Sequence, residues 1–216
     1  AMDLRTGFDF ALEVDRRRAE RIQAEERPRL LVGSPMCGAF SVMQKGQRLR
    51  GAIEHLVFAC ARYHQQIKDG NFFLHEHPKS APSQDLWAIQ NLRQTQGVCT
   101  VTNNQCAFGL RGEGAEGLGF VEKATTWITN SRRIAEALAR ACPNKKNGAA
   151  HRYCTFMSTV PNKGWIVERY PTGIVTAVWN GLRRELLDRH ELSVLEAGPH
   201  LDCLCDTSPC QRDRTS

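Results

Sequence analysis

A cysteine near the start of the chain stands where a nucleophile would be placed. Cys37 follows a short apolar run, 30–32, and lies in the turn-forming stretch GSPMCGAFS at 33–41. A thiol after a buried strand, on a loop rich in glycine and proline, has the usual position of a reactive group in an open α/β sheet. The alternative is that Cys37 is a small buried hydrophobic residue, the commoner role of a free cysteine.

An acidic residue lies at the end of the next apolar run. Residues 71–78, NFFLHEHP, predict a strand in which His75 and His77 flank Glu76. Apolar residues at helical spacing over 53–67 predict a helix between the two strands. The strands should then be parallel neighbours, with Cys37 and Glu76 at adjacent ends. Because side chains alternate along a strand, both histidines should point away from the face that Glu76 uses.

Together the two stretches resemble the motifs of DNA cytosine-5 methyltransferases. GSPMCGAFS is similar to the GGPPCQGFS loop of that family, and LHEH at 74–77 is similar to its ENV motif. A closer variant, SPPCxxFS followed by FLHEHP, resembles one in methyltransferase-like domains of retroelement polyproteins. The resemblance covers about 3–181 and implies an α/β fold, with a Rossmann-like, mostly parallel methyltransferase sheet and flanking helices.

The resemblance also implies a role for each matching residue. Cys37 would add to C6 of a flipped-out cytosine, and Glu76 would contact N3 and the exocyclic amine, so that C5 becomes nucleophilic. Arg111 would be a supporting donor, because its loop resembles the one that carries an Arg-x-Arg motif. The remaining substrate-binding candidates are Ser34, Pro35, Phe40, Ser41, His75, His77 and Gln105.

The methyl donor that the resemblance implies is S-adenosylmethionine. The family holds this cofactor on a first strand and a glycine-rich turn, which would precede Asp3. The chain is therefore expected to begin at about the third strand of such a sheet, with Asp3 as the candidate cofactor-binding residue.

The carboxyl-terminal segment carries side chains that bind metals elsewhere. His200, Cys203, Cys205 and Cys210 have the donor types of a tetrahedral zinc site, although Cys203 and Cys205 are closer in sequence than the usual pairs. Cysteines without a metal role are the alternative. We expect one α/β domain over 3–196 and a weakly ordered tail over 197–216.

Composition predicts a soluble protein of the cell interior, cytoplasmic or nuclear. No apolar run approaches the roughly 20 residues of a membrane span, so no membrane partner is expected. Nine cysteines, an odd number without a secretory leader, favour reduced thiols. The net charge of +6 is compatible with a nucleic-acid partner. The sequence does not predict the oligomeric state.

Periodicity and turn residues predict the other elements. Helices are expected over 12–26, from a cap at 83–85 to Gly97, from a cap at 130–131 to Cys142, and over 171–186. Strands are expected over 98–102 and 125–129, and the glycines over 112–120 predict a flexible loop.

Three classes of function fit these features. The first is methyl transfer to cytosine C5 by Cys37 and Glu76. The second is a catalytically silent module of a polyprotein, used for nucleic-acid binding or assembly. The third is a cysteine hydrolase in which His75 or His77 activates Cys37.

Overall fold

The computed structural model describes residues 1–35, 40, 47–114, 117–121, 123–142 and 170–193. Its main sheet has the order β1-β2-β6-β3, formed by β1 (Leu30–Gly33), β2 (Phe72–Pro78), β6 (Ala124–Thr129) and β3 (Cys99–Asn104). The helices are α1 (Glu13–Glu26), α2 (Gln47–Lys68), α3 (Trp87–Gln94), α4 (Arg132–Leu138) and α7 (Thr172–Asp188). Shorter elements are η1 (Leu4–Thr6), η3 (Pro82–Asp85), η4 (Gln105–Phe108) and the hairpin of β4 (Arg111–Gly114) and β5 (Gly117–Phe120). Among the described residues, none of the helices combines the length and the apolar character that a membrane span needs.

The sheet is mixed, which corrects the expectation of a mostly parallel one. β1 and β2 are parallel neighbours, with Gly33 opposite His75, as predicted from the helix between them. β6 is antiparallel to both β2 and β3. The physical reason is the connection from β3 to β6, which runs through η4 and the β4-β5 hairpin. Without a crossover helix, the chain returns in the opposite direction.

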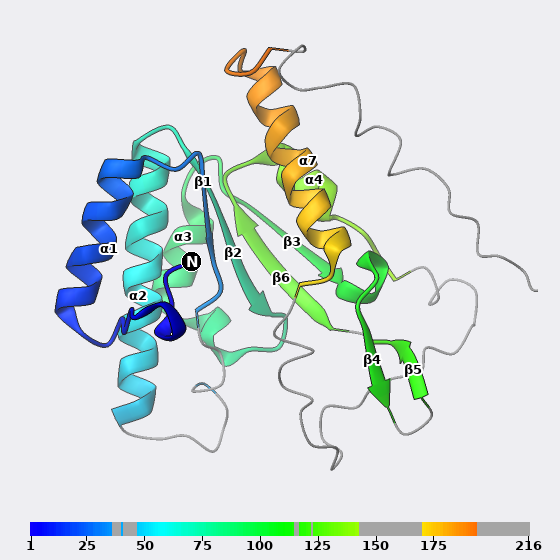
Figure 1. Cartoon of the computed structure of the whole chain (residues 1–216), viewed down its shortest axis with the longest axis horizontal. Helices are drawn as coiled ribbons and strands as arrows, with labels where there is room; N and C mark the ends of the chain where they lie inside the picture. Colours follow the sequence, from blue (N-terminus) through cyan, green and yellow to red (C-terminus); the bar gives the residue numbers. More distant parts are fainter. Residues whose placement is uncertain (36–39, 41–46, 115–116, 122, 143–169, 194–216) are drawn as a thin grey trace, which may run out of the picture.

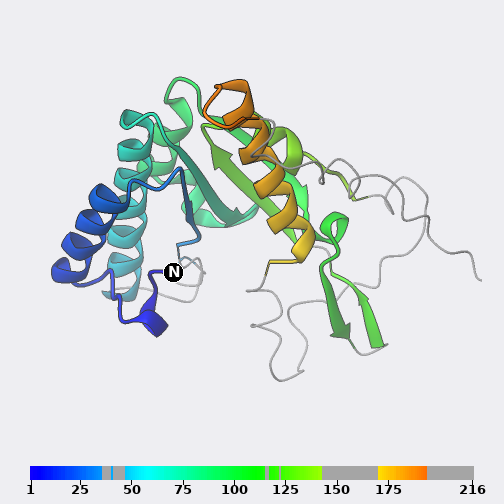
Figure 2. The same cartoon turned by 45° about the horizontal axis from the view of Figure 1, so that its top comes forward.

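Helices cover both faces of the sheet (Figure 1). On one face, α2 and α3 bury Leu56, Tyr63 and Ile89 against Phe73 and Ile128. On the other face, α4 and α7 pack against the alternate residues of the same strands, in a cluster that contains Phe72, Leu74, Trp127, Ile134 and Ile174. α1 lies beside α2, away from the centre of the sheet (Figures 1 and 2). β2 is therefore buried over both of its faces.

Two helices differ from their predicted bounds, because α2 begins at Gln47, before the expected 53, and α4 ends at Leu138, before the expected Cys142. Two other predicted segments form elements of a different kind. The segment expected to cap the third helix forms η3, and α3 begins at Trp87 without a side-chain cap. Ser83 is used elsewhere, because its hydroxyl bonds to His77. The glycine-rich stretch expected to be a flexible loop contains the strands β4 and β5, since backbone pairing does not require side chains.

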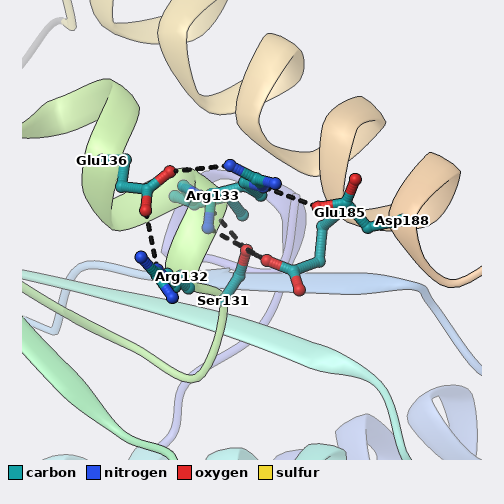
Figure 3. A network of polar contacts seen from close by, with 7 residues as sticks. Ser131, Arg132, Arg133, Glu136, Glu185 and Asp188 are labelled. Atoms are coloured by element: carbon teal, nitrogen blue, oxygen red, sulfur yellow. Dashed lines mark hydrogen bonds and ion pairs between the residues drawn. The ribbon is translucent and has the colours of Figure 1, made fainter.

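α4 and α7 are joined by a polar network around the start of α4 (Figure 3). Ser131 caps α4 by accepting a hydrogen bond from the backbone of Ile134, and its hydroxyl donates to Glu185 at 2.6 Å. The side chain of Arg133 reaches Asp188 of α7 at 2.6 Å. These bonds set the spacing of the two helices, which is close enough that Gly181 of α7 faces the backbone of α4.

Replacing Gly181 by alanine tests this close approach. An added Cβ would lie 2.6 Å from Cα of Ile134, so the two helices must separate. We expect Gly181→Ala to lower the free energy of unfolding by about 1–3 kcal/mol, measured by urea denaturation. Gly51→Ala in α2 is the matched control, because nothing lies within 4 Å of its Cβ position. It should raise stability by about 0.5–1 kcal/mol, since alanine favours a helix over glycine. Equal effects of the two changes would contradict the packing described here.

Candidate functional site

The candidate site lies where β1 and β2 end side by side. Ser34 and Pro35 follow β1 directly, and Glu76 and His77 stand at the end of β2. Parallel strands present their carboxyl ends at the same edge of a sheet, which brings the two predicted motifs together at Ser34, Pro35 and Glu76. Cys37 and Ser41 lie outside the described residues.

His77 fixes the start of the loop that follows β1. Its Nε2 lies 3.0 Å from the carbonyl oxygen of Pro35, which only accepts hydrogen bonds, so Nε2 carries the proton. Nδ1 then accepts from the hydroxyl of Ser83 at 2.8 Å. The ring of Phe40 packs edge-on against the imidazole. Burial lowers the pKa of His77, and the bond to Pro35 and the charge of Glu76 partly oppose this.

His75 is buried on the same face of the sheet as His77. It is fully buried, and its Nδ1 lies 3.2 Å from the hydroxyl of Tyr63. Its ring packs against that of His77, with 5.0 Å between centroids. Burial, followed by the nearby His77, holds the pKa of His75 well below its ordinary range, so the imidazole is neutral. Gly33 is required here, because a Cβ would overlap the hydroxyl of Tyr63.

Glu76 points to the opposite face, as strand alternation predicts. Its carboxylate pairs with Nζ of Lys123 at 3.2 Å, and the two side chains are only 7% and 15% exposed. Trp127 is the cross-strand neighbour of Glu76, and its ring lies 5.7 Å from that of Tyr170. The hydroxyls of Tyr170 and Ser34 share a hydrogen bond. Burial first, and the charge of Glu76 next, raise the pKa of Tyr170, which keeps its hydroxyl protonated.

Gln105 holds the backbone beneath this ion pair. Its N–H donates to the carbonyl of Lys123, and its side-chain Nε2 donates to the hydroxyl of Thr125, each at 3.0 Å. Gln105 is fully buried, so among the described residues it supports Lys123 and does not line an open surface. The expected substrate contact of Gln105 stays a prediction.

Arg111 and Asp3 have other contacts within the described part of the chain. The guanidinium of Arg111 packs on the ring of Phe120, 4.5 Å from its centroid, across the β4-β5 hairpin. Oδ1 of Asp3 accepts the backbone N–H groups of Arg5 and Thr6 and so caps η1. Neither contact involves Glu76.

The candidate zinc ligands His200, Cys203, Cys205 and Cys210 lie outside the described residues, as does the whole tail over 197–216. Within the described ranges, His, Cys, Asp and Glu side chains form no group that could hold a metal ion.

Three residues of the site were not predicted as candidates from the sequence: Lys123, Tyr170 and Ser83. Lys123 directly precedes the strand β6, and a charged residue next to a buried strand was the available signal. Tyr170 precedes Pro171 and the start of α7. Neither position indicates a partner until the strand order is known, because β6 is inserted beside β2 only in the folded sheet.

Comparisons of the chain with protein-family models, with curated proteins and with solved structures found no match.

The buried histidines predict how stability depends on pH. Their pKa values are lowered in the folded state, so below about pH 6.5 the unfolded chain binds protons that the folded chain excludes. We expect the free energy of unfolding to fall between pH 7 and pH 5, with a limiting slope of about 1.4 kcal/mol per pH unit for each such histidine. Urea denaturation at several pH values measures this. His75→Gln should reduce the slope, and an unchanged slope in that variant would contradict the assignment.

The ion pair of Glu76 and Lys123 predicts a stability loss when one partner is removed. Lys123→Met leaves a buried carboxylate without its cation, and we expect a loss of about 3 kcal/mol at pH 7. Adding Glu76→Gln to this variant should recover stability, because the charge is then gone. Arg17→Met, which breaks the exposed pair with Glu13, is the control and should cause only a small loss. The measurement is chemical denaturation, and no recovery in the double variant would count against the pairing.

Proposed function

We propose that the chain is a cytosine-5 methyltransferase-like core that holds a cytosine base of a nucleic acid against Glu76. The observation that carries this proposal is the buried pair of Glu76 and Lys123, 3.2 Å apart at the end of β2 and on the side of Ser34 and Tyr170. The resemblance of the two motifs supplies the reaction, with Cys37 as the nucleophile.

The two charges of this pair match the edge of cytosine. One carboxyl oxygen of Glu76 accepts from the exocyclic amine at C4, the other meets the acceptor N3 through a proton held between them, and the ammonium of Lys123 donates to the carbonyl oxygen at C2. Uracil and thymine carry an oxygen at C4 and a hydrogen on N3, so they present the reverse pattern to the same carboxyl group. A pair of Glu76 and Lys123 is therefore suited to cytosine among the pyrimidines. Both side chains are buried, where a polar group left without a partner is costly. Each contact therefore discriminates against a base that cannot make it.

The start of the cysteine loop is held from both faces of the sheet. Pro35 is tied to His77 on one face, and Ser34 is tied to Tyr170 on the other. Cys37 follows Pro35 by two residues in the sequence. Such anchoring is suited to a nucleophile that must meet one atom of a base, because small errors in position are costly.

The bonds of His77 favour base binding over the hydrolase alternative. A cysteine hydrolase needs an imidazole nitrogen that can take the proton of the thiol. Both nitrogens of His77 are engaged, by Pro35 and by Ser83, and His75 is fully buried. These contacts suit a positioning role for both histidines.

The methyl donor implied by the resemblance is S-adenosylmethionine, which would supply the methyl group. Asp3, its expected contact, uses its carboxylate to cap η1. Because Oδ1 of Asp3 is engaged in this cap, we derive no step through the cofactor. The proposal is limited to the base and to the nucleophile.

Exchange of the cytosine C5 hydrogen tests the proposal without the methyl donor. The thiolate of Cys37 forms a bond to C6, C5 takes a deuteron from D₂O, and loss of the original C5 proton to solvent with expulsion of the thiolate restores the ring. We expect a cytosine-containing oligonucleotide to gain deuterium at C5 in the presence of the protein. Mass spectrometry of the recovered nucleoside is the measurement.

Matched variants identify the groups responsible. Cys37→Ser should abolish the exchange, and Glu76→Gln should slow it about 100-fold, because the contact that polarises the ring is weakened. Cys99→Ser on β3 is the control and should leave the rate unchanged. Binding of the oligonucleotide without any exchange would favour the silent-module alternative. Labelling of Cys37 by an acyl electrophile that depends on His77 would favour the hydrolase.

A further inference from the structure

Tyr170 links the segment that carries Cys37 to the side chain of Glu76. Its hydroxyl shares a hydrogen bond with that of Ser34, which directly follows β1, and it also makes a hydrogen bond with Glu76. The ring of Tyr170 lies 5.7 Å from that of Trp127, which is opposite Glu76 in the pairing of β2 with β6. One side chain at the start of α7 therefore connects the ends of β1 and β2.

The chemistry of the three groups fixes the direction of these hydrogen bonds. A carboxylate only accepts, and a tyrosine hydroxyl has a single hydrogen to donate. Tyr170 therefore donates to Glu76, and its oxygen accepts from the hydroxyl of Ser34. Burial, and then the charge of Glu76, raise the pKa of Tyr170, so this hydrogen stays in place. The result is a directed chain of donors from Ser34 through Tyr170 to Glu76.

The position of Tyr170 is itself fixed by the packing of α7. Pro171 is the N-cap residue of this helix, and its ring restricts the backbone directly after Tyr170. Gly173 in the first turn lies so close to η4 that a Cβ would be 2.4 Å from the carbonyl oxygen of Phe108. Near its other end, α7 is joined to α4 through Glu185 (Figure 3). A helix held at both ends keeps Tyr170 in one place.

The proposed reaction requires such a link, because two parts of the site act on one base. The thiolate of Cys37 attacks C6 while Glu76 holds N3 and the amine at C4, so the nucleophile and the carboxyl group must be aligned with each other. The ion pair with Lys123 does not supply this alignment, since a flexible ammonium acts as a point charge. A hydrogen bond from Tyr170 adds the missing direction.

We propose that Tyr170 is a positioning residue that aligns the carboxyl group of Glu76 with the segment that carries Cys37. The inference rests on the proposed function, because it concerns the same base and the same nucleophile. Tyr170 acts through Glu76, and Ser34 orients the hydroxyl of Tyr170 in turn. Each carboxylate oxygen has two lone pairs, so a hydrogen bond from Tyr170 leaves lone pairs for the base.

The exchange of the cytosine C5 hydrogen tests the proposal on the whole chain. Tyr170→Phe keeps the ring and removes the hydroxyl, and we expect it to lower the exchange rate at saturating oligonucleotide about tenfold. Ser34→Ala should lower the rate by a smaller factor, whereas Ser34→Thr keeps a hydroxyl and should not lower it. Thr95→Val is the control, because it removes a hydroxyl that bonds only to the end of α3.

A second background shows whether Tyr170 acts through Glu76. In a chain that already carries Glu76→Gln, the carboxyl group that Tyr170 aligns is gone. Tyr170→Phe should therefore change the remaining rate by no more than about twofold. A tenfold loss in both backgrounds would mean that Tyr170 acts independently of Glu76, and the proposal would be wrong.

Fluorine NMR follows the link in the protein without nucleic acid. Replacing tyrosine by 3-fluorotyrosine gives a signal for Tyr170, which Tyr170→Phe identifies. We expect Glu76→Gln to shift this signal, whereas Glu13→Gln in the exposed pair on α1 should leave it in place. A signal that does not respond to Glu76→Gln would overturn the proposal.

These outcomes separate the inference from the proposed function. Exchange by the unaltered chain that Tyr170→Phe does not slow would overturn the inference alone. No exchange by the unaltered chain would overturn both. Urea denaturation of each variant shows whether it is folded, and the comparison of Ser34→Ala with Ser34→Thr carries the test if Tyr170→Phe is not.

Discussion

β2 has to satisfy two buried environments at once, because helices cover both faces of the sheet. Its apolar half fills both cores, with Phe73 on the α2 side and Leu74 on the α7 side. Its polar half must then find partners on both sides as well, since a buried polar group without one is costly. His77 hydrogen-bonds to Ser83 and to the carbonyl of Pro35, and Glu76 forms an ion pair with Lys123. These interactions hold Pro35, which follows β1, and Lys123, which precedes β6, next to the end of β2.

This requirement separates the histidines from the carboxylate at the end of the sheet. The imidazoles lie on the face where burial keeps them neutral, and their bonds hold the turn after β1. The carboxylate lies on the other face, where it pairs with Lys123 and where the charge of Glu76 acts on the hydroxyl of Tyr170. His77 thus holds the turn after β1, whereas Glu76 pairs with Lys123. In a sheet covered by helices on one face only, the polar residues could face water. The histidines and the carboxylate would then not need separate buried partners.

Much of the fold could be predicted because periodicity is local. The helices α1 and α7 and the strands β1, β2 and β6 were expected close to their observed bounds, whereas α2 begins at Gln47, well before the expected 53. The parallel contact of β1 with β2 was also expected. The expectation for the sheet as a whole was wrong, because strand direction depends on the connection between strands. η4 and the β4-β5 hairpin make β6 return antiparallel, and glycine-rich sequence gave no sign of strands there.

The sequence by itself determined which residues stand at the ends of β1 and β2, and on which face each points, because strand alternation is a property of the backbone. It also placed Glu76 opposite to its flanking histidines. Only the tertiary structure decided the partners. Lys123 and Tyr170 meet at Glu76 because β6 is inserted beside β2 and α7 lies across the sheet. Pairings between residues 47 and 94 positions apart arise from the packing of whole elements, and no local pattern encodes them.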